Sequence, residues 1–330
     1  MFSISKDRSV IIRGVAILAM LWLHLFNILN NVALCGPMAS VCGMPWAHWL
    51  TAACNPVMLF VLLSGYGHYL TRERTSFRQL CKRVGRLYVV WWVVLAVFVG
   101  VAQVMEPGRY LGNAWEVVGN ALAWQVTFNA EAWFLFPYAM LSLSSKALFA
   151  LLDRAGEVVT LLVTLMIYAS CSWLVKDEQV QALGIPHSLY MLLLYGRLIF
   201  FFMVGAWMCR HAGSFTRVSL GRWWLWGALL LAVVVQCLVR REMMYVWYTP
   251  LVVLLLAHAP LVPVVQRVLT VLGRYSMPMW LVHTWFAYYL FKDYVYALRY
   301  PVLIFLALTL VSLATSWVVM QAVRPLLRRL

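Results

Sequence analysis

The chain has few charged residues and lacks the usual motifs of a soluble metal- or phosphate-binding enzyme. Only 11% of its 330 residues are Asp, Glu, Lys or Arg, against about 25% in typical soluble domains. The seven cysteines and seven histidines show no zinc-site spacing, and no glycine-rich phosphate loop or low-complexity linker is present. We therefore expect no bound metal, and we expect any chemistry to lie among apolar segments.

Apolar segments fill most of the chain, because 64% of its residues are hydrophobic. A membrane-spanning helix needs about twenty such residues. The sequence predicts an all-α, polytopic membrane protein in which residues 1–330 form a single membrane-embedded domain. We count about ten candidate spans, of which the seventh to ninth are short: 10–31, 50–70, 87–105, 132–151, 158–175, 190–209, 223–238, 245–258, 276–291 and 301–323.

The distribution of basic residues predicts that both termini are cytoplasmic. With an inside N-terminus, most of the 26 Lys and Arg residues fall on the cytoplasmic side, as the positive-inside rule requires. The net charge of +15 therefore reflects membrane topology and gives no support for nucleic-acid binding. The first span is too long for a signal peptide, so we interpret it as a retained helix. Cys35 and Cys42 fall in the first outside loop, where an oxidising environment would allow a disulfide.

The first apolar segment carries an unusual ionisable pair, Arg13 and His24. Eleven helical steps return to within about 20° of the same face and advance about 16 Å, which places His24 near mid-membrane. Asn27 and Asn31 extend the same polar stripe. Such residues commonly mark a reaction centre or a transport path. The alternative is a hydrogen-bonding role that only joins helices.

The loop after the second span contains a dense set of cations. If it is helical, Arg78, Lys82 and Arg86 lie at four-residue steps on one face, continuing from Arg74. Several cationic donors on one face suit a pyrophosphate-bearing cytosolic ligand. The alternative is a topological anchor that touches anionic lipid.

Three further polar residues fall within or beside apolar segments. Arg197 lies inside the sixth span and needs a partner, for which Glu131 at the start of the fourth span is one candidate. Snorkelling of Arg197 to the interface is the alternative. His283 in the ninth span either lines a cavity or is a hydrogen-bonded histidine of the bundle.

Taken in order, these motifs resemble the acyltransferase-3 family of integral-membrane acyltransferases. The resemblance covers most of the chain and is carried by six stretches: Arg13 and His24 separated by ten residues, FVLLSG at 60–65, CKRVGRLYVVWW at 81–92, AWFL at 132–135, Arg197 with Phe202 and Gly205, and YSMPMWLVHTWF at 275–286. The chain departs from the family pattern at Val89, where a proline is common, and at Trp280, which stands in a tyrosine position.

The resemblance implies acyl transfer, usually of acetyl from cytosolic acetyl-coenzyme A to a hydroxyl of a surface glycan or lipid-linked sugar. His24 would act as general base or acyl relay together with Arg13, and the basic loop with Arg13 would hold the coenzyme A phosphates. We assign Asn27, Asn31, Glu131, Arg197 and His283 to substrate binding. The expected location is a bacterial inner membrane, and the expected partners are membrane lipid and either a separate extracytoplasmic transferase or a second copy of the chain. The alternative is a non-catalytic transporter or export component for a polysaccharide precursor.

Overall fold

The computed structural model describes residues 4–110, 112–212 and 222–328, and within these ranges the regular secondary structure is helical apart from one short hairpin. The described residues divide into two compact units that are not contiguous in sequence. Unit 1 comprises 58–88 and 114–212, and unit 2 comprises 4–57, 89–110, 112–113 and 222–328. The single membrane-embedded domain expected from the sequence stays a prediction.

Unit 1 is built around α7, α8 and α10, which pack against one another. Gly156, with φ of 81°, makes the tight turn between α7 and α8. Glycines also let α4 and α10 approach closely, because a Cβ on Gly65 would lie 1.9 Å from the Phe202 carbonyl oxygen. The elements are α4 (Pro56–Leu70, from Met58 on), η2 (Arg72–Arg74), α5 (Phe77–Met105, up to Tyr88), α6 (Ala114–Ala121), η3 (Ala130–Phe134), α7 (Leu135–Ala155), α8 (Glu157–Leu174), α9 (Asp177–Ala182) and α10 (His187–Arg210).

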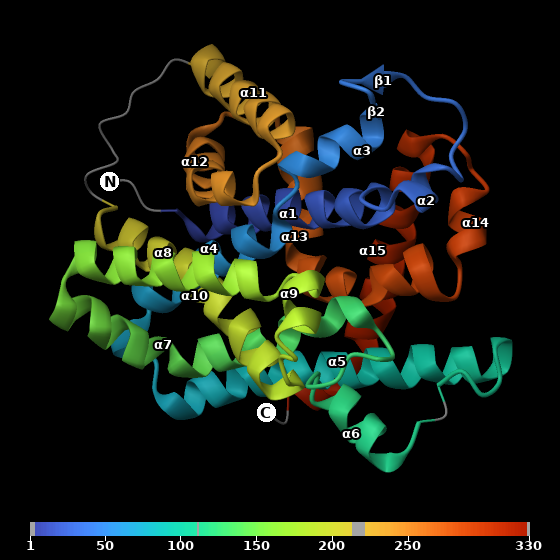
Figure 1. Cartoon of the computed structure of the whole chain (residues 1–330), viewed down its shortest axis with the longest axis horizontal. Helices are drawn as coiled ribbons and strands as arrows, with labels where there is room; N and C mark the ends of the chain where they lie inside the picture. The colour runs from blue at the N-terminus through green and yellow to red at the C-terminus, as the bar shows by residue number, and fades with distance from the viewer. Residues whose placement is uncertain (1–3, 111, 213–221, 329–330) are drawn as a thin grey trace. The chain divides into compact units, whose positions relative to one another are not determined.

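Unit 2 is built around α1 and α13, which have the most extensive contact of any helix pair (Figure 1). The Ser5 hydroxyl caps α1 by accepting from the Arg8 amide, and Pro263 occupies the first turn of α13. The elements are α1 (Lys6–Phe26), α2 (Leu29–Val32), β1 (Ser40–Val41), β2 (Met44–Pro45), α3 (Trp46–Leu50), η1 (Thr51–Ala53), α5 from Val89 on, α11 (Arg222–Val239), η5 (Glu242–Met244), α12 (Tyr245–His258), α13 (Pro263–Thr284), a π-helical turn η6 (Trp285–Tyr289), α14 (Lys292–Tyr296) and α15 (Pro301–Leu327).

In the part of the chain that the structure describes, seven helical segments are long and apolar enough to cross a membrane, which agrees with a multi-pass membrane protein. They correspond to seven of the ten predicted spans: Lys6–Phe26, Trp46–Leu70, Phe77–Met105, Ala130–Ala155, Glu157–Leu174, His187–Arg210 and Pro301–Leu327. The remaining three predicted spans fall on α11, α12 and α13, so the count of ten stays a prediction.

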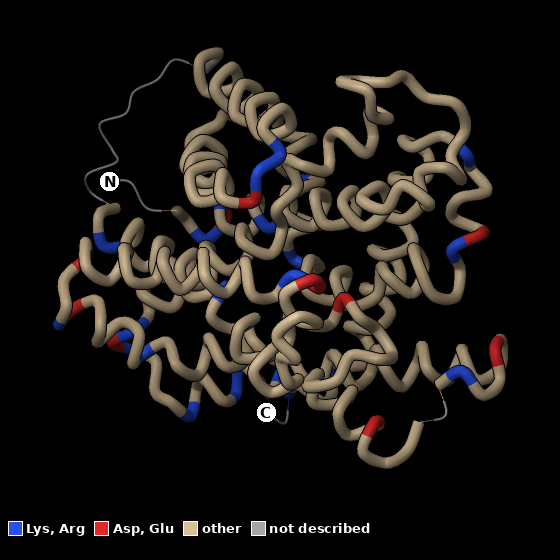
Figure 2. Tube along the Cα trace, viewed as in Figure 1, with Lys and Arg blue, Asp and Glu red and all other residues tan. Residues whose placement is uncertain are grey.

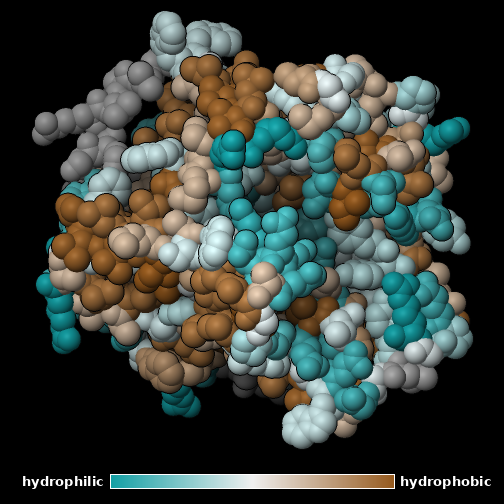
Figure 3. All heavy atoms as spheres, viewed as in Figure 1, coloured by the Kyte–Doolittle hydropathy of each residue, from teal (hydrophilic) through white to brown (hydrophobic). Residues whose placement is uncertain are grey.

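Apolar side chains cover the outside of several helices, as lipid-facing surfaces require. In α8, Val158 and Met166 are 71% and 69% exposed, and in α11 Trp223 is 82% exposed. Figure 3 shows hydrophobic residues gathered over both helices. Figure 2 shows that Lys, Arg, Asp and Glu lie mainly in loops and at helix ends, which leaves long uncharged stretches between them.

Two predicted boundaries are wrong. The first span ends at Phe26 and not at Asn31, because the chain turns at Asn27 and begins the separate helix α2 at Leu29. The ninth predicted span, 276–291, is the second half of α13 followed by η6, and α13 already begins at Pro263. The row of cations predicted to continue from Arg74 is also shorter than expected. Arg74 lies in η2, outside α5, so it does not continue the row of cations on that helix.

Both cysteines of the first outside loop are free thiols in the structure. Burial raises the pKa of the Cys35 thiol, whereas Cys42 is exposed. Cys42 and Cys81 are both exposed, and the sequence predicts that they lie on opposite sides of the membrane.

Single-cysteine variants that retain only Cys42 or only Cys81 test the predicted topology. A membrane-impermeant maleimide should label Cys42 in intact cells and Cys81 only after permeabilisation, since basic residues flank Cys81 and none flanks Cys42. Labelling is read as a mass shift of the purified chain. The reverse pattern would contradict an inside N-terminus.

A second test concerns the close packing of α1 and α13. Gly273→Ala should lower the free energy of unfolding by about 1–3 kcal/mol, because the new methyl group would lie 1.9 Å from the Val10 carbonyl oxygen. Gly100→Ala is the matched control in the same unit, since its Cβ meets open space. Thermal unfolding in detergent should show a lower Tm for Gly273→Ala only; equal Tm values would refute the tight crossing.

Candidate active site

The contact between α1 and α13 brings two histidines together. A Cβ on Gly14 would lie 2.2 Å from the Leu269 carbonyl oxygen, so the two backbones are as close as glycine permits. His24 follows Gly14 by ten residues, and His283 follows Gly273 by ten residues. Because the helices run parallel, equal spacing lifts both rings about 15 Å beyond the crossing. The rings meet edge-on, with centroids 4.9 Å apart and planes at 89°.

Tyr288 completes this cluster from the π-helical turn η6. Its hydroxyl donates to the His24 carbonyl oxygen and lies 3.3 Å from Asn27 Oδ1. The turn is defined by the Leu290 amide, which donates to the Trp285 carbonyl oxygen five residues earlier, at 2.9 Å. π-helical turns inside α-helical segments are frequent at functional sites. Tyr288 thus joins the candidate site, although the sequence did not predict it.

Burial differs sharply within the cluster. His283 is fully buried, the His24 side chain is half-buried, and Asn27 is exposed at the end of α1. The exposed end of the cluster is therefore the Asn27 end, and its buried end is at His283.

Two predicted partners of His24 lie elsewhere in unit 2. Arg13 is about 16 Å away along α1, beside the glycine crossing, where its Nε donates to the Ser9 carbonyl oxygen at 3.4 Å. Asn31 is buried in α2. The straight polar stripe that the sequence predicts thus ends at Asn27. His24 itself lies two residues from the end of α1, about 3 Å along the axis, and not near the middle of the helix.

Unit 1 contains a small cationic pocket at the start of α5. Its lining includes His68, Arg72, Arg83 and Lys146, and its space of about 10 Å³ admits a single water molecule. One Arg83 guanidinium nitrogen donates to Thr75 Oγ1 at 3.4 Å. Arg83 and Lys146 are exposed, so the pocket opens to the surface.

The predicted basic strip lies on the same helix but outside this pocket. Arg78, Lys82 and Arg86 are exposed and make no hydrogen bond or ion pair with the residues that the structure describes. They are available to an anion in solution. Arg83, which the four-residue spacing passed over, is the arginine of this segment that lines the pocket.

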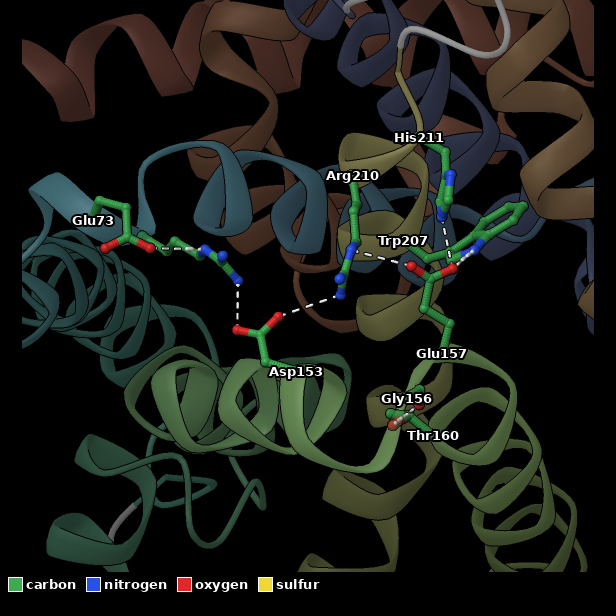
Figure 4. A network of polar contacts seen from close by, with 9 residues as sticks. Glu73, Asp153, Gly156, Glu157, Thr160, Trp207, Arg210 and His211 are labelled. Atoms are coloured by element: carbon green, nitrogen blue, oxygen red, sulfur yellow. Dashed lines mark hydrogen bonds and ion pairs between the residues drawn. The ribbon is translucent and has the colours of Figure 1, made fainter.

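A network of charges joins the helix ends next to this pocket (Figure 4). Asp153 accepts from Arg72 at 3.0 Å and from Arg210 at 3.3 Å. Glu157 in turn binds Arg210, His211 and the Trp207 indole N–H, at 3.1, 2.6 and 3.0 Å. Arg72 is therefore partly neutralised, which leaves Arg83 and Lys146 as the stronger anion-binding groups of the pocket.

The comparisons with known proteins decide the family. The model of the acyltransferase-3 family, described as an acyltransferase domain, matches residues 10–321. The chain belongs to this family. A search of curated proteins and a search of solved structures each return no match.

The other predicted substrate-binding residues of the acyltransferase, Arg197 and Glu131, lie in unit 1. The Arg197 Nε donates to Ser172 Oγ on α8 at 3.2 Å, and Glu131 lies half-buried in η3. Substrate roles for both residues stay predictions. Among the described residues of the acyltransferase, no group of three His, Cys, Asp or Glu side chains is placed to hold a metal ion.

Proposed function

We propose that this membrane acyltransferase moves an acetyl group from cytosolic acetyl-coenzyme A to a hydroxyl of a surface glycan or lipid-linked sugar in a bacterial inner membrane. The observation that carries the proposal is the half-buried His24 in edge-on contact with His283, within a chain of this family. The acceptor would lie outside the cytosol. A separate extracytoplasmic transferase or a second copy of the chain are further proposed partners.

In the proposed reaction, His24 acts as general base. The acceptor hydroxyl gives its proton to His24 as its oxygen attacks the thioester carbonyl carbon. A C–O bond forms, the C–S bond breaks, and the departing sulfur takes up the proton. A neutral imidazole suits this role because its ordinary pKa of about 6.5 lies close to physiological pH.

The cations of unit 1 are proposed to bind the phosphates of the donor. Arg83 and Lys146 at the pocket, with the exposed Arg78, Lys82 and Arg86, supply several charged donors on one segment. Arginine suits this purpose because its planar fork binds phosphate with two hydrogen bonds. We also propose that Arg13 contributes to donor binding or catalysis, as the sequence predicts.

Calorimetric titration of the purified protein with coenzyme A tests the donor site. Replacing Arg83, Lys82 or Arg86 by Ala should each weaken binding about ten- to a hundredfold, since a charged hydrogen bond is worth roughly 1.5–3 kcal/mol. Arg154→Ala is the matched control, an exposed arginine at the end of α7. Unchanged affinity in all variants would leave these residues as topological anchors.

The central prediction concerns His24, measured in membrane vesicles from a gene-deletion strain that carries each variant. These vesicles contain the native acceptor, and the readout is radiolabel incorporated from acetyl-coenzyme A. His24→Ala should lower incorporation at least a hundredfold because a general base contributes roughly 10²–10⁴ in rate. Coenzyme A affinity should stay nearly unchanged.

His24→Gln separates a base from a structural hydrogen-bonding group, because glutamine cannot accept a proton at neutral pH. Near-normal incorporation with this variant would exclude His24 as the base. A transporter would give no protein-dependent incorporation at all, and equal labelling of wild-type and deletion vesicles would therefore reject the enzymatic function.

A further inference from the structure

His283 is held in one orientation by the backbone of its own helix. Its Nδ1 lies 2.7 Å from the Trp280 carbonyl oxygen and 3.2 Å from the Met279 carbonyl oxygen. A carbonyl oxygen can only accept a hydrogen bond, so Nδ1 carries the proton. In a neutral imidazole the other nitrogen, Nε2, then carries a lone pair.

That lone pair is buried without a hydrogen-bond donor. The His283 side chain has 0% exposure, and no described residue forms a hydrogen bond with Nε2. Buried polar atoms are nearly always paired, since an unsatisfied one is costly. His283 Nε2 can therefore accept a hydrogen bond from a donor that forms beside it.

The His24 ring in contact with His283 gains such a donor when it takes up a proton. A neutral histidine has one N–H group, whereas an imidazolium has two. A cation in a poorly hydrated site is stabilised only if its N–H groups are hydrogen-bonded. The two ring centroids are 4.9 Å apart, so the movement required is a rotation of the His24 ring that brings one of its N–H groups to His283 Nε2, while His283 keeps its orientation.

We propose that His283 is a positioning residue that accepts a hydrogen bond from His24 once His24 has taken the proton of the acceptor hydroxyl. The inference rests on the proposed function of His24 as the base. No covalent bond forms at His283, and its own proton stays on Nδ1, bonded to the Trp280 carbonyl oxygen. The residue thereby stabilises the charged intermediate state of His24 and fixes the direction of its ring.

Three substitutions separate this role from packing. His283→Asn keeps an amide N–H near the Nδ1 position and removes the acceptor at Nε2, whereas His283→Gln places an amide oxygen near Nε2. His283→Leu removes both polar groups at similar volume. Label incorporation in the vesicle assay, per mole of folded chain, should fall about ten- to a hundredfold for Asn and Leu and less than tenfold for Gln. The KM for acetyl-coenzyme A should stay unchanged.

The matched control is His258→Asn in α12. The Nδ1 of His258 also lies 2.8 Å from a carbonyl oxygen one turn earlier, that of Leu254, so the substitution perturbs an equivalent backbone contact in the same unit. This variant should retain wild-type incorporation. A similar loss at His258 and His283 would assign the effect to helix packing and overturn the proposal.

A double-mutant comparison completes the test. If His283 acts only through His24, adding His283→Asn to His24→Ala should change incorporation less than twofold. Multiplying losses would overturn the inference, as would wild-type incorporation by His283→Asn or a loss with Gln as large as with Asn. Should Asn not accumulate in the membrane, Leu takes its place in both backgrounds. Failure of the proposed function looks different, because wild-type vesicles would then incorporate no more label than deletion vesicles.

Discussion

The site in unit 2 depends on the absence of two side chains, at Gly14 and Gly273. Either Cβ would overlap a carbonyl group of the opposite helix, so only glycine allows α1 and α13 to cross at this distance. Apolar helices gain no hydrophobic free energy by leaving lipid for one another, because the lipid tails are equally apolar. The van der Waals packing that close approach allows is therefore a main source of their association. Because the helices cross in parallel, this contact also sets how residues further along α1 and α13 align along the helix axes, including His24 and His283.

A buried histidine of unit 1, His68, and one of unit 2, His283, differ in how their ring nitrogens are hydrogen-bonded. In unit 1, His68 Nδ1 lies 3.0 Å from the Ser64 carbonyl oxygen, and its Nε2 lies 2.9 Å from Ser142 Oγ. Both nitrogens are therefore satisfied, as a histidine that joins helices requires. His283 has the same kind of contact at Nδ1 but no described partner at Nε2. This difference is the observation behind the positioning role proposed for His283.

Much of the fold, but less of the site, could be predicted from the sequence. Apolar length identified seven helices and the family motifs identified the acyltransferase domain. The predicted polar stripe is wrong beyond Asn27, because ideal helical geometry contains no information about where α1 ends. Tyr288 was missed because a π-helical turn leaves no mark in apolar periodicity. Arg83 was missed because the four-residue spacing selects one face of α5, whereas tertiary packing places the pocket beside another.

His24, the proposed base, lies near the end of α1, and this position indicates which of the two substrates it would serve. The thioester carbonyl carbon is already electrophilic and needs no help from a base. A sugar hydroxyl keeps its proton at neutral pH and becomes a good nucleophile only when a base removes that proton. A general base therefore belongs beside the hydroxyl. With a cytoplasmic N-terminus, the end of α1 that carries His24 and the exposed Asn27 is the end nearer the outside. An acceptor outside the cytosol would reach that end first, so the location of the histidine agrees with the chemistry that the acceptor demands.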